Sequence, residues 1–436
     1  MAVTLKNGLI MHVRTLILGA GLTGLSTAYH LEELGQTDYL LAEQDGAPGG
    51  LCKSVYKDGF TFDYAGHLLH LHTEYGKKLV KKLLKTNLRR QPRNAWIYTG
   101  AARVPFPFQA NLFALPPDVR QACVDGLVKA AQNKKTTAPK NFKEWCLRAF
   151  GPGVYETFMR PYNTKLWGRA PENMTADWCG PFVPLPSPDE ILKSAQKPPR
   201  KKFGYNAYFY YPQTGGCQAL VNALAAHVKN LQLSSPVSRV HLRKKTAVIN
   251  GKTVSFDYLV NTLALPAFLK LLADEPALTR AAEKLTVRPV TVYNLAVRGA
   301  QKEPFSWIYC PDETDPFFRV GMQSSFAPQN APAGCRSYYI ELPGEQTPSP
   351  AAEKHVWNAL LQKGIIDKHD KKLFSFWQFL PYAYAVYDKN RRSAVQKTLA
   401  RLERRGCLCA GRYGKWEYSF METSLLQGLK TAKKLV

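Results

Sequence analysis

The hydrophobic and polar positions near the start of the chain predict a strand, a helix and a second strand. Residues 13–43 read VRTLILGAGLTGLSTAYHLEELGQTDYLLAE, in which an apolar run is followed by a glycine turn, an amphipathic stretch and another apolar run. Continuous apolar runs are typical of strands buried on both faces, and the stretch between them has the helical period. This order predicts a β-α-β unit with a parallel sheet.

The turn of this unit has the spacing of a dinucleotide-binding motif, with Gly19, Gly21 and Gly24 followed by Glu43 at the end of the second run. The first glycine permits a tight turn, the second lets a pyrophosphate approach the backbone, and the third lets the helix pack closely on the strand. The helix start attracts the anion, and the carboxylate accepts hydrogen bonds from ribose hydroxyls. Because all these parts are in register, we predict a dinucleotide cofactor.

Later hydrophobic patterns predict both helices and strands. Apolar residues at helical spacing predict helices near 117–132 and 141–150. Alternation of inward and outward positions in VTVYNLAV (290–297) and SYYIEL (337–342) predicts strands of a second sheet.

One aromatic segment, VPFPFQANL (104–112), fits neither pattern. Pro105 and Pro107 each remove a backbone donor, so a central strand or a helix interior is excluded. Proline also favours extended geometry at the residue before it. We therefore expect an extended segment that holds two aromatic side chains and Gln109 in fixed positions.

The formal net charge of the chain is +26, from 59 Lys and Arg against 33 Asp and Glu. Such a charge favours an anionic binding partner, which could be nucleic acid, an anionic membrane or a small anionic substrate. The charge is dispersed and no nucleic-acid-binding motif accompanies it, so we expect no nucleic-acid partner. In KKLVKKLLK (77–85) leucines and lysines separate at helical spacing. That segment indicates either a peripheral contact with a membrane surface or a solvated basic helix face.

The nine cysteines have no regular spacing, and the closest pair is Cys407 and Cys409 on an apolar run. No second cysteine pair or HxxH motif accompanies them, so we predict no metal site. No apolar run approaches the ~20 residues of a membrane span, and the N-terminus lacks the cleavage region of a signal peptide. We therefore predict a cytoplasmic protein with reduced cysteines.

A second glycine motif narrows the choice of dinucleotide cofactor. Gly49 and Gly50, followed by Leu51, come shortly after Glu43. This arrangement resembles the FAD-binding halves of amine-oxidase and glutathione-reductase-like flavoproteins, which implies FAD. Beyond the first motif, the resemblance implies these cofactor-binding positions: Gly50, Leu51, Val237, Gly411 and Arg412.

The resemblance implies an α/β fold. A discontinuous Rossmann-like FAD-binding domain carries a helical insert and a six- to seven-stranded, mainly antiparallel substrate-domain sheet. The expected FAD-binding parts are residues 11–74, 206–265 and 400–436. Residues 75–205 are expected to form a mainly helical cap, and residues 266–399 the sheet-rich substrate domain. In the FAD-binding domain we expect helices on one face of a parallel sheet and a smaller sheet on the other.

Segments outside the FAD parts carry a more specific resemblance. They are VPFPFQ (104–109), RPYNTKLWG (160–168), FFRV (317–320), LPYAY (380–384) and GRYGKWEY (411–418). Together they resemble the UDP-galactopyranose mutase family, and the resemblance runs through most of the chain.

This resemblance implies a nucleotide end and a sugar end of one binding site. Uracil is expected against Phe106 and Phe108, with Gln109 bonding the edge of the base. Asn163 and Trp167 are expected near the sugar. From the residue types alone, Phe106, Phe108 and Trp167 are also compatible with core packing.

The resemblance also implies residues for the diphosphate and the flavin. Arg319, Tyr384 and Tyr418 are expected to hold the diphosphate, because guanidinium groups bind phosphate oxygens bidentately and tyrosine hydroxyls add neutral donors. His67 and Arg412 are expected beside the flavin. His70 and His72 are expected to be structural or exposed.

One position departs from the family pattern. Pro181 and Phe182 stand where a polar and a basic residue are expected, the second of them a further diphosphate ligand. Arg169 matches an arginine on a mobile loop of the family. Two alternatives follow: Arg169 substitutes for the missing ligand, or the nucleotide is held in a different way.

The activity implied is that of a flavin-dependent mutase. It interconverts pyranose and furanose forms of a UDP-sugar with reduced FAD, with NAD(P)H as a candidate reductant and a role in cell-wall polysaccharide biosynthesis. One alternative is an FAD-dependent oxidoreductase of the amine oxidase or protoporphyrinogen oxidase type. Another is a non-catalytic FAD-binding protein held at a membrane by its basic clusters. Monomer and homodimer are both compatible with the sequence.

Overall fold

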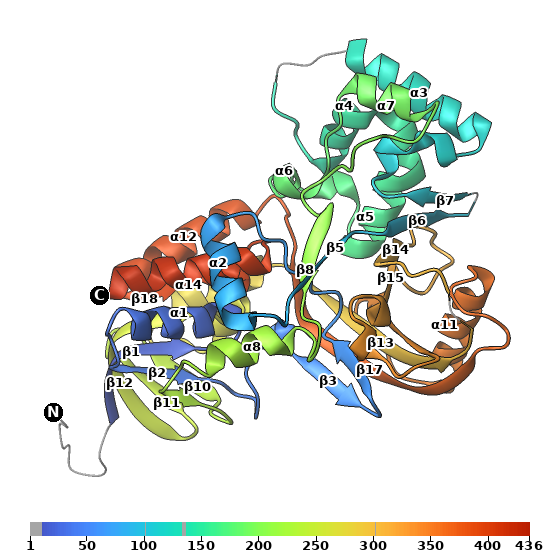
Figure 1. Cartoon of the computed structure of the whole chain (residues 1–436). Coiled ribbons are helices and arrows are strands. Elements are labelled where there is room, and N and C mark those ends of the chain that lie inside the picture. The colour runs from blue at the N-terminus through green and yellow to red at the C-terminus, as the bar shows by residue number, and fades with distance from the viewer. Residues whose placement is uncertain (1–10, 101, 133–136, 301) are drawn as a thin grey trace.

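The computed structural model describes residues 11–100, 102–132, 137–300 and 302–436 of the 436-residue chain. Within them two seven-stranded sheets occupy separate halves of the molecule, and a helical insert packs beside the second sheet (Figure 1). The predicted fold class, an α/β fold with a discontinuous Rossmann-like domain, a helical insert and a second sheet, is confirmed.

The first sheet joins strands from distant parts of the chain. Its strands are β1 (Met11–Leu18), β2 (Tyr39–Ala42), β9 (Leu231–Gln232), β10 (Val237–His241), β11 (Thr246–Ile249), β12 (Lys252–Asn261) and β18 (Cys407–Cys409). The order is β10-β11-β12-β1-β2-β9, and β18 also pairs with β12. The pairs among β9, β2, β1, β12 and β18 are parallel, whereas β10 and β11 form an antiparallel edge.

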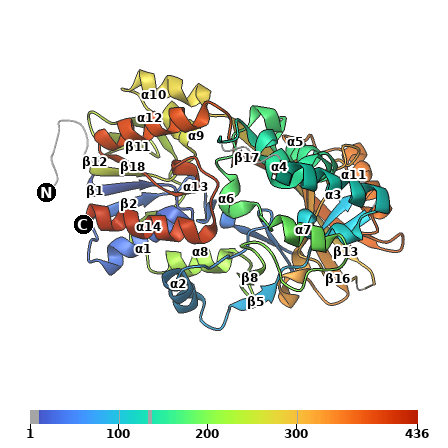
Figure 2. The ribbon, with the colours of Figure 1, turned by 90° about the horizontal axis from the view of Figure 1, so that it is seen from above.

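Helices cover both faces of this sheet. Successive side chains of a strand point to opposite faces, so Ile17 packs in one core cluster while Leu16 and Leu18 pack in another. Figure 2 shows a helix layer on each side. The face of Ile17 is covered by α1 (Leu22–Glu33), α8 (Gln218–Ala225) and α14 (Met421–Leu435), and the other by α9 (Leu265–Lys270), α10 (Pro276–Ala281) and α12 (Arg391–Arg404). The expected smaller sheet on the second face is wrong, because β10 and β11 continue the main sheet.

Close backbone contacts hold the turn between β1 and α1. Gly19 has a φ of +92°, and a Cβ on Gly24 would lie 1.9 Å from the Gly19 carbonyl oxygen. The Ala20 N–H donates to Glu43 Oε2 at 2.8 Å, which ties the turn to the end of β2. Local geometry therefore requires glycine at both ends of this turn.

The second sheet is mainly antiparallel. Its strands are, in spatial order, β17 (Lys371–Ala385), β13 (Val287–Arg298), β16 (Cys335–Pro343), β15 (Arg319–Met322), β14 (Trp307–Tyr309), β6 (Ala95–Thr99) and β7 (Ala102–Pro105). Only β14 and β6 pair in parallel among them. The strands β6 and β7 were not expected within the mainly helical part. Pro105 ends β7, which is an edge strand of the sheet. A missing backbone N–H there removes no hydrogen bond to a further strand.

The helical insert follows the predicted pattern. Its helices are α3 (Pro117–Gln132), α4 (Phe142–Val154), α5 (Arg160–Trp167), α6 (Cys179–Phe182) and α7 (Pro188–Ser194). Helix α4 runs past the predicted end near 150 through a kink at Gly151, whose φ is +76°. A Cβ on Gly151 would lie 2.3 Å from the Gly126 carbonyl carbon, so two glycines bring α3 and α4 together.

The remaining elements connect these parts. They are β3 (Ser54–Lys57), β4 (Phe60–Asp63), α2 (Glu74–Leu84), β5 (Arg89–Pro92), β8 (Tyr208–Tyr211), α11 (Pro350–Gln362) and α13 (Gly411–Gly414). In α2, which contains the KKLVKKLL residues, Leu79, Val80 and Leu84 are buried in the core. The apolar side of this helix therefore packs within the chain, and its lysines face outward.

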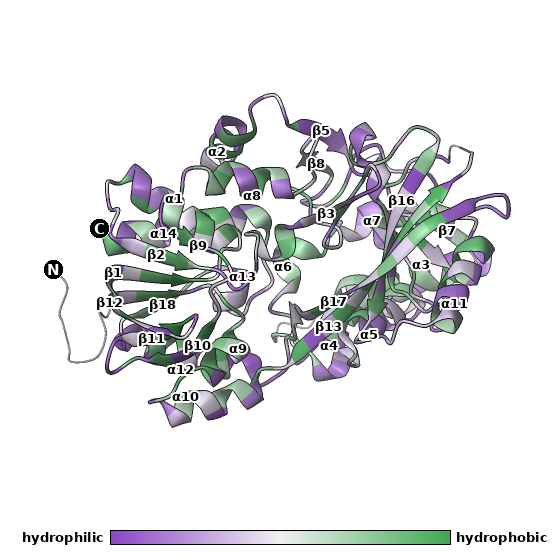
Figure 3. Cartoon of the chain, turned by 90° about the horizontal axis from the view of Figure 1, so that it is seen from below, coloured by the Kyte–Doolittle hydropathy of each residue, from purple (hydrophilic) through white to green (hydrophobic). Residues whose placement is uncertain are grey.

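Hydrophobic residues follow the strands of the first sheet and the helix faces that pack on them (Figure 3). Within the described ranges, the structure contains no helix with the length and apolar character needed to cross a membrane.

A buried carboxylate connects the two halves of the molecule. Asp63, at the end of β4, is 1% exposed. The groups that donate hydrogen bonds to it are Ser54 Oγ (2.6 Å), Tyr211 OH (2.6 Å), the Cys217 N–H (2.9 Å) and Gln323 Nε2 (2.9 Å). Cys217 precedes α8 in the first half, and Gln323 follows β15 in the second sheet, so this carboxylate joins the two.

Replacement of Gly24 by alanine is expected to destabilise the protein by roughly 1–3 kcal/mol. The added methyl group meets the Gly19 carbonyl, which outweighs the gain of up to about 1 kcal/mol from alanine in a helix. Thermal denaturation of the purified protein measures the effect. Gly180→Ala is the matched control, because Gly180 lies in α6, away from this turn, and a Cβ there meets no described atom within 4 Å. Equal melting temperatures for wild type and both variants would contradict the close packing of this turn.

Candidate active site

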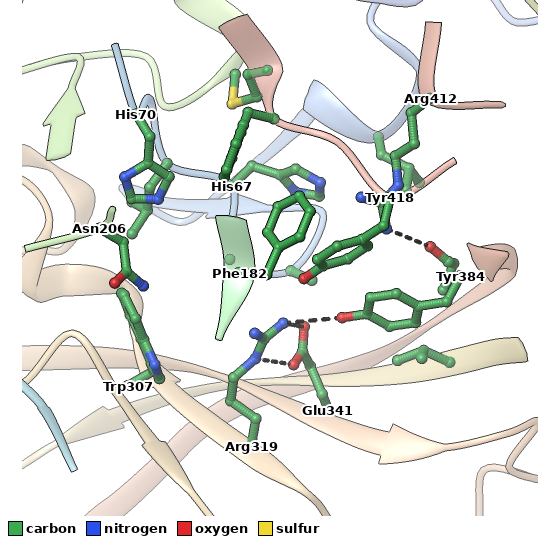
Figure 4. Close-up of a pocket in the computed structure, with 18 of the residues that line it drawn as sticks. His67, His70, Phe182, Asn206, Trp307, Arg319, Glu341, Tyr384, Arg412 and Tyr418 are labelled. Carbon is green, nitrogen blue, oxygen red and sulfur yellow. Dashed lines mark hydrogen bonds and ion pairs between the residues drawn. The ribbon is translucent and has the colours of Figure 1, made fainter. Parts of the chain in front are cut away.

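A cavity lies where the first half of the molecule meets the second sheet (Figure 4). It is lined by the segment between β4 and α2, the segment before α14, the strands β13 to β17, the end of α6 and the segment before β8. Its charged and strongly polar side chains, apart from tyrosines, include His67, His70, Asn206, Arg319, Glu341 and Arg412.

Arg319 and Glu341 form an ion pair on the wall of this cavity. They lie opposite each other on β15 and β16. Glu341 accepts from Arg319 Nε and, at 2.7 Å, from Nη2. Arg319 Nη2 also lies 3.4 Å from the Tyr384 hydroxyl oxygen. Burial acts to lower the Arg319 pKa, but Glu341 and Tyr384 outweigh it and hold that pKa well above its usual value. Arg319 therefore stays charged and has the partner that a buried arginine requires.

Arg412 is fixed beside a tyrosine. Its Nη1 and Nη2 donate to the carbonyl oxygens of Ser419 and Ala383, each at 3.2 Å. The guanidinium carbon lies 4.6 Å from the Tyr418 ring centroid, a cation–π contact. Burial acts to lower the Arg412 pKa, but neighbouring tyrosines, Tyr413 first, raise it overall. This arginine therefore orients Tyr418 toward the cavity.

His67 is neutral and has a ring nitrogen available for a ligand. Burial, and then the charge of Arg412, lower the His67 pKa to about 4. Its Nδ1 is buried without a hydrogen-bond partner among the described residues. Burial also lowers the His70 pKa to about 4. His70 lines the cavity, in contrast to the sequence expectation, whereas His72 is exposed.

Four aromatic side chains form one side of the cavity, which we call the aromatic wall: Phe182, Tyr205, Tyr418 and Phe420. The Phe182 ring centroid lies 4.3 Å from that of Tyr418 and 4.7 Å from that of Phe420. The Tyr205 and Phe420 centroids are 4.7 Å apart. Such close, mostly tilted pairs pack favourably and form an apolar surface. Phe182 therefore places a ring where the family pattern has a basic residue.

Two further side chains of the cavity lining carry hydrogen-bond donors. Asn206 is buried, and its Oδ1 accepts from Arg93 Nη1, which leaves the amide N–H groups for a ligand. Trp307 is also buried, and its indole N–H interacts with the Tyr309 side chain. Figure 4 shows both residues on the side of the cavity away from Arg412.

The start of α1 fits the pyrophosphate of a dinucleotide. Gly21 is the N-cap residue, and a Cβ on it would meet no described atom within 4 Å. Gly50 and Gly411 approach this turn closely, since a Cβ on Gly411 would lie 2.3 Å from Thr23 Oγ1. Open space at a helix N-terminus, surrounded by close backbone, is what a bound pyrophosphate requires.

The adenosine side of the predicted site lies beyond β2. The Ser235 N–H donates to the Glu43 carbonyl oxygen at 2.7 Å. Val237 begins β10 two residues later. Val237 therefore lies two residues from a hydrogen bond to Glu43, the predicted ribose ligand at the end of β2.

The cavity brings together only some of the predicted residues. Those that line it are Leu51, His67, Arg319, Tyr384, Arg412 and Tyr418. Those that lie off its lining are Phe106, Phe108, Gln109, Asn163, Trp167 and Arg169. The residues predicted to hold the flavin ring and the diphosphate therefore share one cavity, whereas those predicted to hold uracil lie outside its lining.

The aromatic segment VPFPFQ lies largely in the core. Gln109 is 1% exposed, and its Nε2 donates to the Pro184 carbonyl oxygen at 2.6 Å. Phe108 is fully buried and stacks on Phe158. Phe106 is half-buried, with its ring 5.2 Å from that of Tyr309, a cavity residue. Gln109 therefore faces closed core and not the predicted cleft.

The residues expected near the sugar lie behind the cavity wall. The Trp167 indole N–H donates to Asn163 Oδ1 at 3.2 Å, and the Trp167 ring packs 5.5 Å from that of Tyr384. Arg169 pairs with Asp388 at 3.6 Å. Arg169 therefore lies outside the cavity lining, and its substitution for the basic residue expected at Phe182 stays a prediction.

The cavity also contains residues that the sequence interpretation missed. They include Glu341, Tyr205, Asn206, Trp307 and Phe420. For Glu341 a signal was present, because a charged residue ends the alternating SYYIE run and a buried arginine requires an acidic partner. The others lie on loops or short strands whose position depends on the tertiary fold.

The family model of flavin containing amine oxidoreductases matches residues 22–436. The chain belongs to this family. The predicted cofactor, FAD, is thereby confirmed, and the residues around Gly21 fit it.

Solved structures place the chain within this family. The crystal structure of a reduced UDP-galactopyranose mutase is 27% identical, with a TM-score of 0.91 over 97% of this chain and 93% of that one. The chain is therefore a mutase-like member of the family, as the motifs predict. A putative protoporphyrinogen oxidase from Exiguobacterium sp. 255-15 is 15% identical, with a TM-score of 0.71 over 97% of this chain and 98% of that one. The second likeness shows the shared fold.

Acidification is expected to destabilise the protein through His67. An unfolded chain binds a proton at histidine near pH 6.5, whereas the folded His67 pKa is about 4. Stability is therefore lost as the pH falls from about 6.5 toward 4. His67→Gln removes this effect, so its melting temperature is expected to fall less between pH 7.5 and 5, by the equivalent of roughly 1–2 kcal/mol.

His72→Gln is the matched control, because His72 is exposed. It is expected to follow the wild type in the same melting series. A His67→Gln variant that loses as much stability on acidification as the wild type would contradict a neutral His67.

Proposed function

We propose that the chain is a flavin-dependent mutase that interconverts the pyranose and furanose forms of a UDP-sugar with reduced FAD. The observation that carries the proposal is the convergence of Arg319, Tyr384 and Tyr418 in one cavity with His67 and Arg412. The similarity to a reduced UDP-galactopyranose mutase supports it. An NAD(P)H-derived reductant, a cytoplasmic location and a role in cell-wall polysaccharide biosynthesis stay predictions from the sequence.

The side chains of the cavity would bind and orient the substrate. Arg319 Nη1 and the hydroxyls of Tyr384 and Tyr418 offer donors to the oxygens of a diphosphate. The aromatic wall limits the access of water to the sugar, and a fixed orientation lowers the entropic barrier of the reaction. FAD, when bound, supplies the covalent chemistry at the sugar.

The titratable groups near the cavity agree with a reaction carried by the cofactor. Burial raises the pKa of the Cys52 thiol to about 12, so it is not a thiolate at neutral pH. Burial also raises the pKa of Cys217 well above its usual value. Neither thiol therefore favours the thiolate form that a nucleophilic cysteine needs.

A second candidate function is that of an FAD-dependent oxidoreductase. The observation in its favour is the aromatic wall, because Phe182 and Phe420 present apolar rings where a nucleotide diphosphate would need donors. The burial of Gln109 also removes the base-reading group predicted from the sequence. A flat apolar substrate would suit such a surface.

Turnover by the two redox states of the enzyme separates these candidates. FAD-loaded enzyme reduced with dithionite is expected to convert UDP-galactopyranose, or a related UDP-sugar, to its furanose form, as measured by chromatography. The oxidised enzyme is expected to be inactive in that assay. Hydrogen peroxide production by the oxidised enzyme, without furanose formation by the reduced one, would establish the oxidoreductase instead.

Arg319→Ala is expected to weaken UDP binding by roughly tenfold to a hundredfold, since a hydrogen bond to a charged group contributes about 1.5–3 kcal/mol. Tryptophan fluorescence of the FAD-loaded enzyme measures UDP binding, and flavin absorbance measures retention of FAD. Arg160→Ala is the control. Arg160 is half exposed at the start of α5, outside the cavity, and pairs with Glu156 in the preceding turn. Unchanged UDP affinity in Arg319→Ala, or loss of FAD, would show that Arg319 has another role.

A further inference from the structure

The pairing of Arg319 with Glu341 determines which part of the guanidinium group faces a ligand. Glu341 occupies Nε and Nη2, the two nitrogens of one forked edge. Among the described residues, Nη1 is the guanidinium nitrogen without a protein hydrogen-bond partner. An incoming phosphate therefore meets the Nη1 end of the guanidinium group, because Glu341 occupies the Nε–Nη2 edge that would otherwise bind it bidentately.

Glu341 also changes the charge that a ligand meets. It is 2% exposed and lines the same cavity as Arg319. The charged side chains on the lining are Arg319, Arg412 and Glu341 within the described residues, because His67 and His70 are neutral at pH 7 with a pKa of about 4 each. The lining therefore carries one net positive charge, whereas the diphosphate of a UDP-sugar brings about two negative charges and free UDP, whose terminal phosphate has a second pKa near 6, brings more.

We propose that Glu341 is a specificity-determining residue that limits how much negative charge the cavity accepts. It neutralises Arg319 and holds its forked edge, so that a nucleoside diphosphate is bound through Nη1 and is released readily. This inference rests on the proposed function, in which the diphosphate is the group held at Arg319.

Two anions, Glu341 and the bound phosphate, compete for one cation in this cavity. Glu341 and the phosphates both require Arg319, and in a partly desolvated cavity like charges a few ångströms apart repel strongly. Removal of the carboxylate charge frees the forked edge and removes this repulsion. The gain in affinity therefore increases with the charge of the ligand.

The test is Glu341→Gln in the FAD-loaded enzyme, with uridine, UMP and UDP as a series of increasing charge. UDP is expected to bind about tenfold tighter or more than it does to the wild type, UMP to gain less, and uridine to be unchanged, as measured by tryptophan fluorescence. The salt dependence of UDP binding is expected to become steeper. Equal weakening of all three ligands would show a structural role and overturn the inference.

Glu353→Gln is the matched control. Glu353 lies on α11 outside the cavity and pairs with Lys372. The affinities for the three ligands are expected to stay at wild-type values in this variant. A gain for UDP as large as that of Glu341→Gln would show that general surface charge, and not the ion pair of the cavity, is responsible.

Inorganic pyrophosphate separates this inference from the proposed function. Failure of wild type and Glu341→Gln to bind any uridine ligand would contradict the proposed function. Tighter pyrophosphate binding by Glu341→Gln than by the wild type would still support the role of Glu341, and equal or weaker binding would overturn it. If Glu341→Gln loses FAD, Glu341→Ala, which also removes the carboxylate charge and the hydrogen bonds to Arg319, is expected to bind pyrophosphate more tightly than the wild type. Unchanged or weaker binding by that variant would overturn the inference.

Discussion

The carboxylate of Asp63 is the group on which the relative position of the two halves depends. A buried carboxylate is tolerated when its oxygens are saturated with donors, and Asp63 receives hydrogen bonds from both halves of the molecule. Gln323 brings the end of β15, the strand of Arg319, to this point. Cys217 donates through its thiol to the His67 carbonyl oxygen at 2.9 Å. One hydrogen-bonded carboxylate therefore links the side of the cavity that carries His67 to the side that carries Arg319.

The chemistry of the cavity follows from this arrangement. Its histidine is neutral, one arginine is paired with Glu341, and the other is engaged by carbonyl groups and by Tyr418. The surface opposite Arg319 is aromatic. Such a cavity holds a ligand by a few directed hydrogen bonds and by ring contacts more than by net charge. That property suits an enzyme whose cofactor performs the covalent chemistry while the protein orients the substrate.

Much of the fold was predictable because it depends on local backbone geometry. The contact of Gly24 with the preceding turn and the hydrogen bond of Glu43 lie within one β-α-β unit, so their spacing along the chain carries the information. The site was predictable only in part. The strand that carries Glu341 was predicted, but its pairing with Arg319 depends on the register of two strands, which alternation alone does not determine. Gln109 was misplaced because an extended segment can face either a cleft or the core, and the packing against Pro184 decides between them.

The central claim is that the cavity beside the flavin binds the diphosphate of a nucleotide through Arg319. A crystal structure of the FAD-loaded, dithionite-reduced enzyme with UDP tests it most directly. We expect the diphosphate to lie within hydrogen-bonding distance of Arg319 Nη1 and of the hydroxyl groups of Tyr384 and Tyr418. UDP bound elsewhere, or a cavity that stays free of nucleotide at saturating UDP, would contradict it.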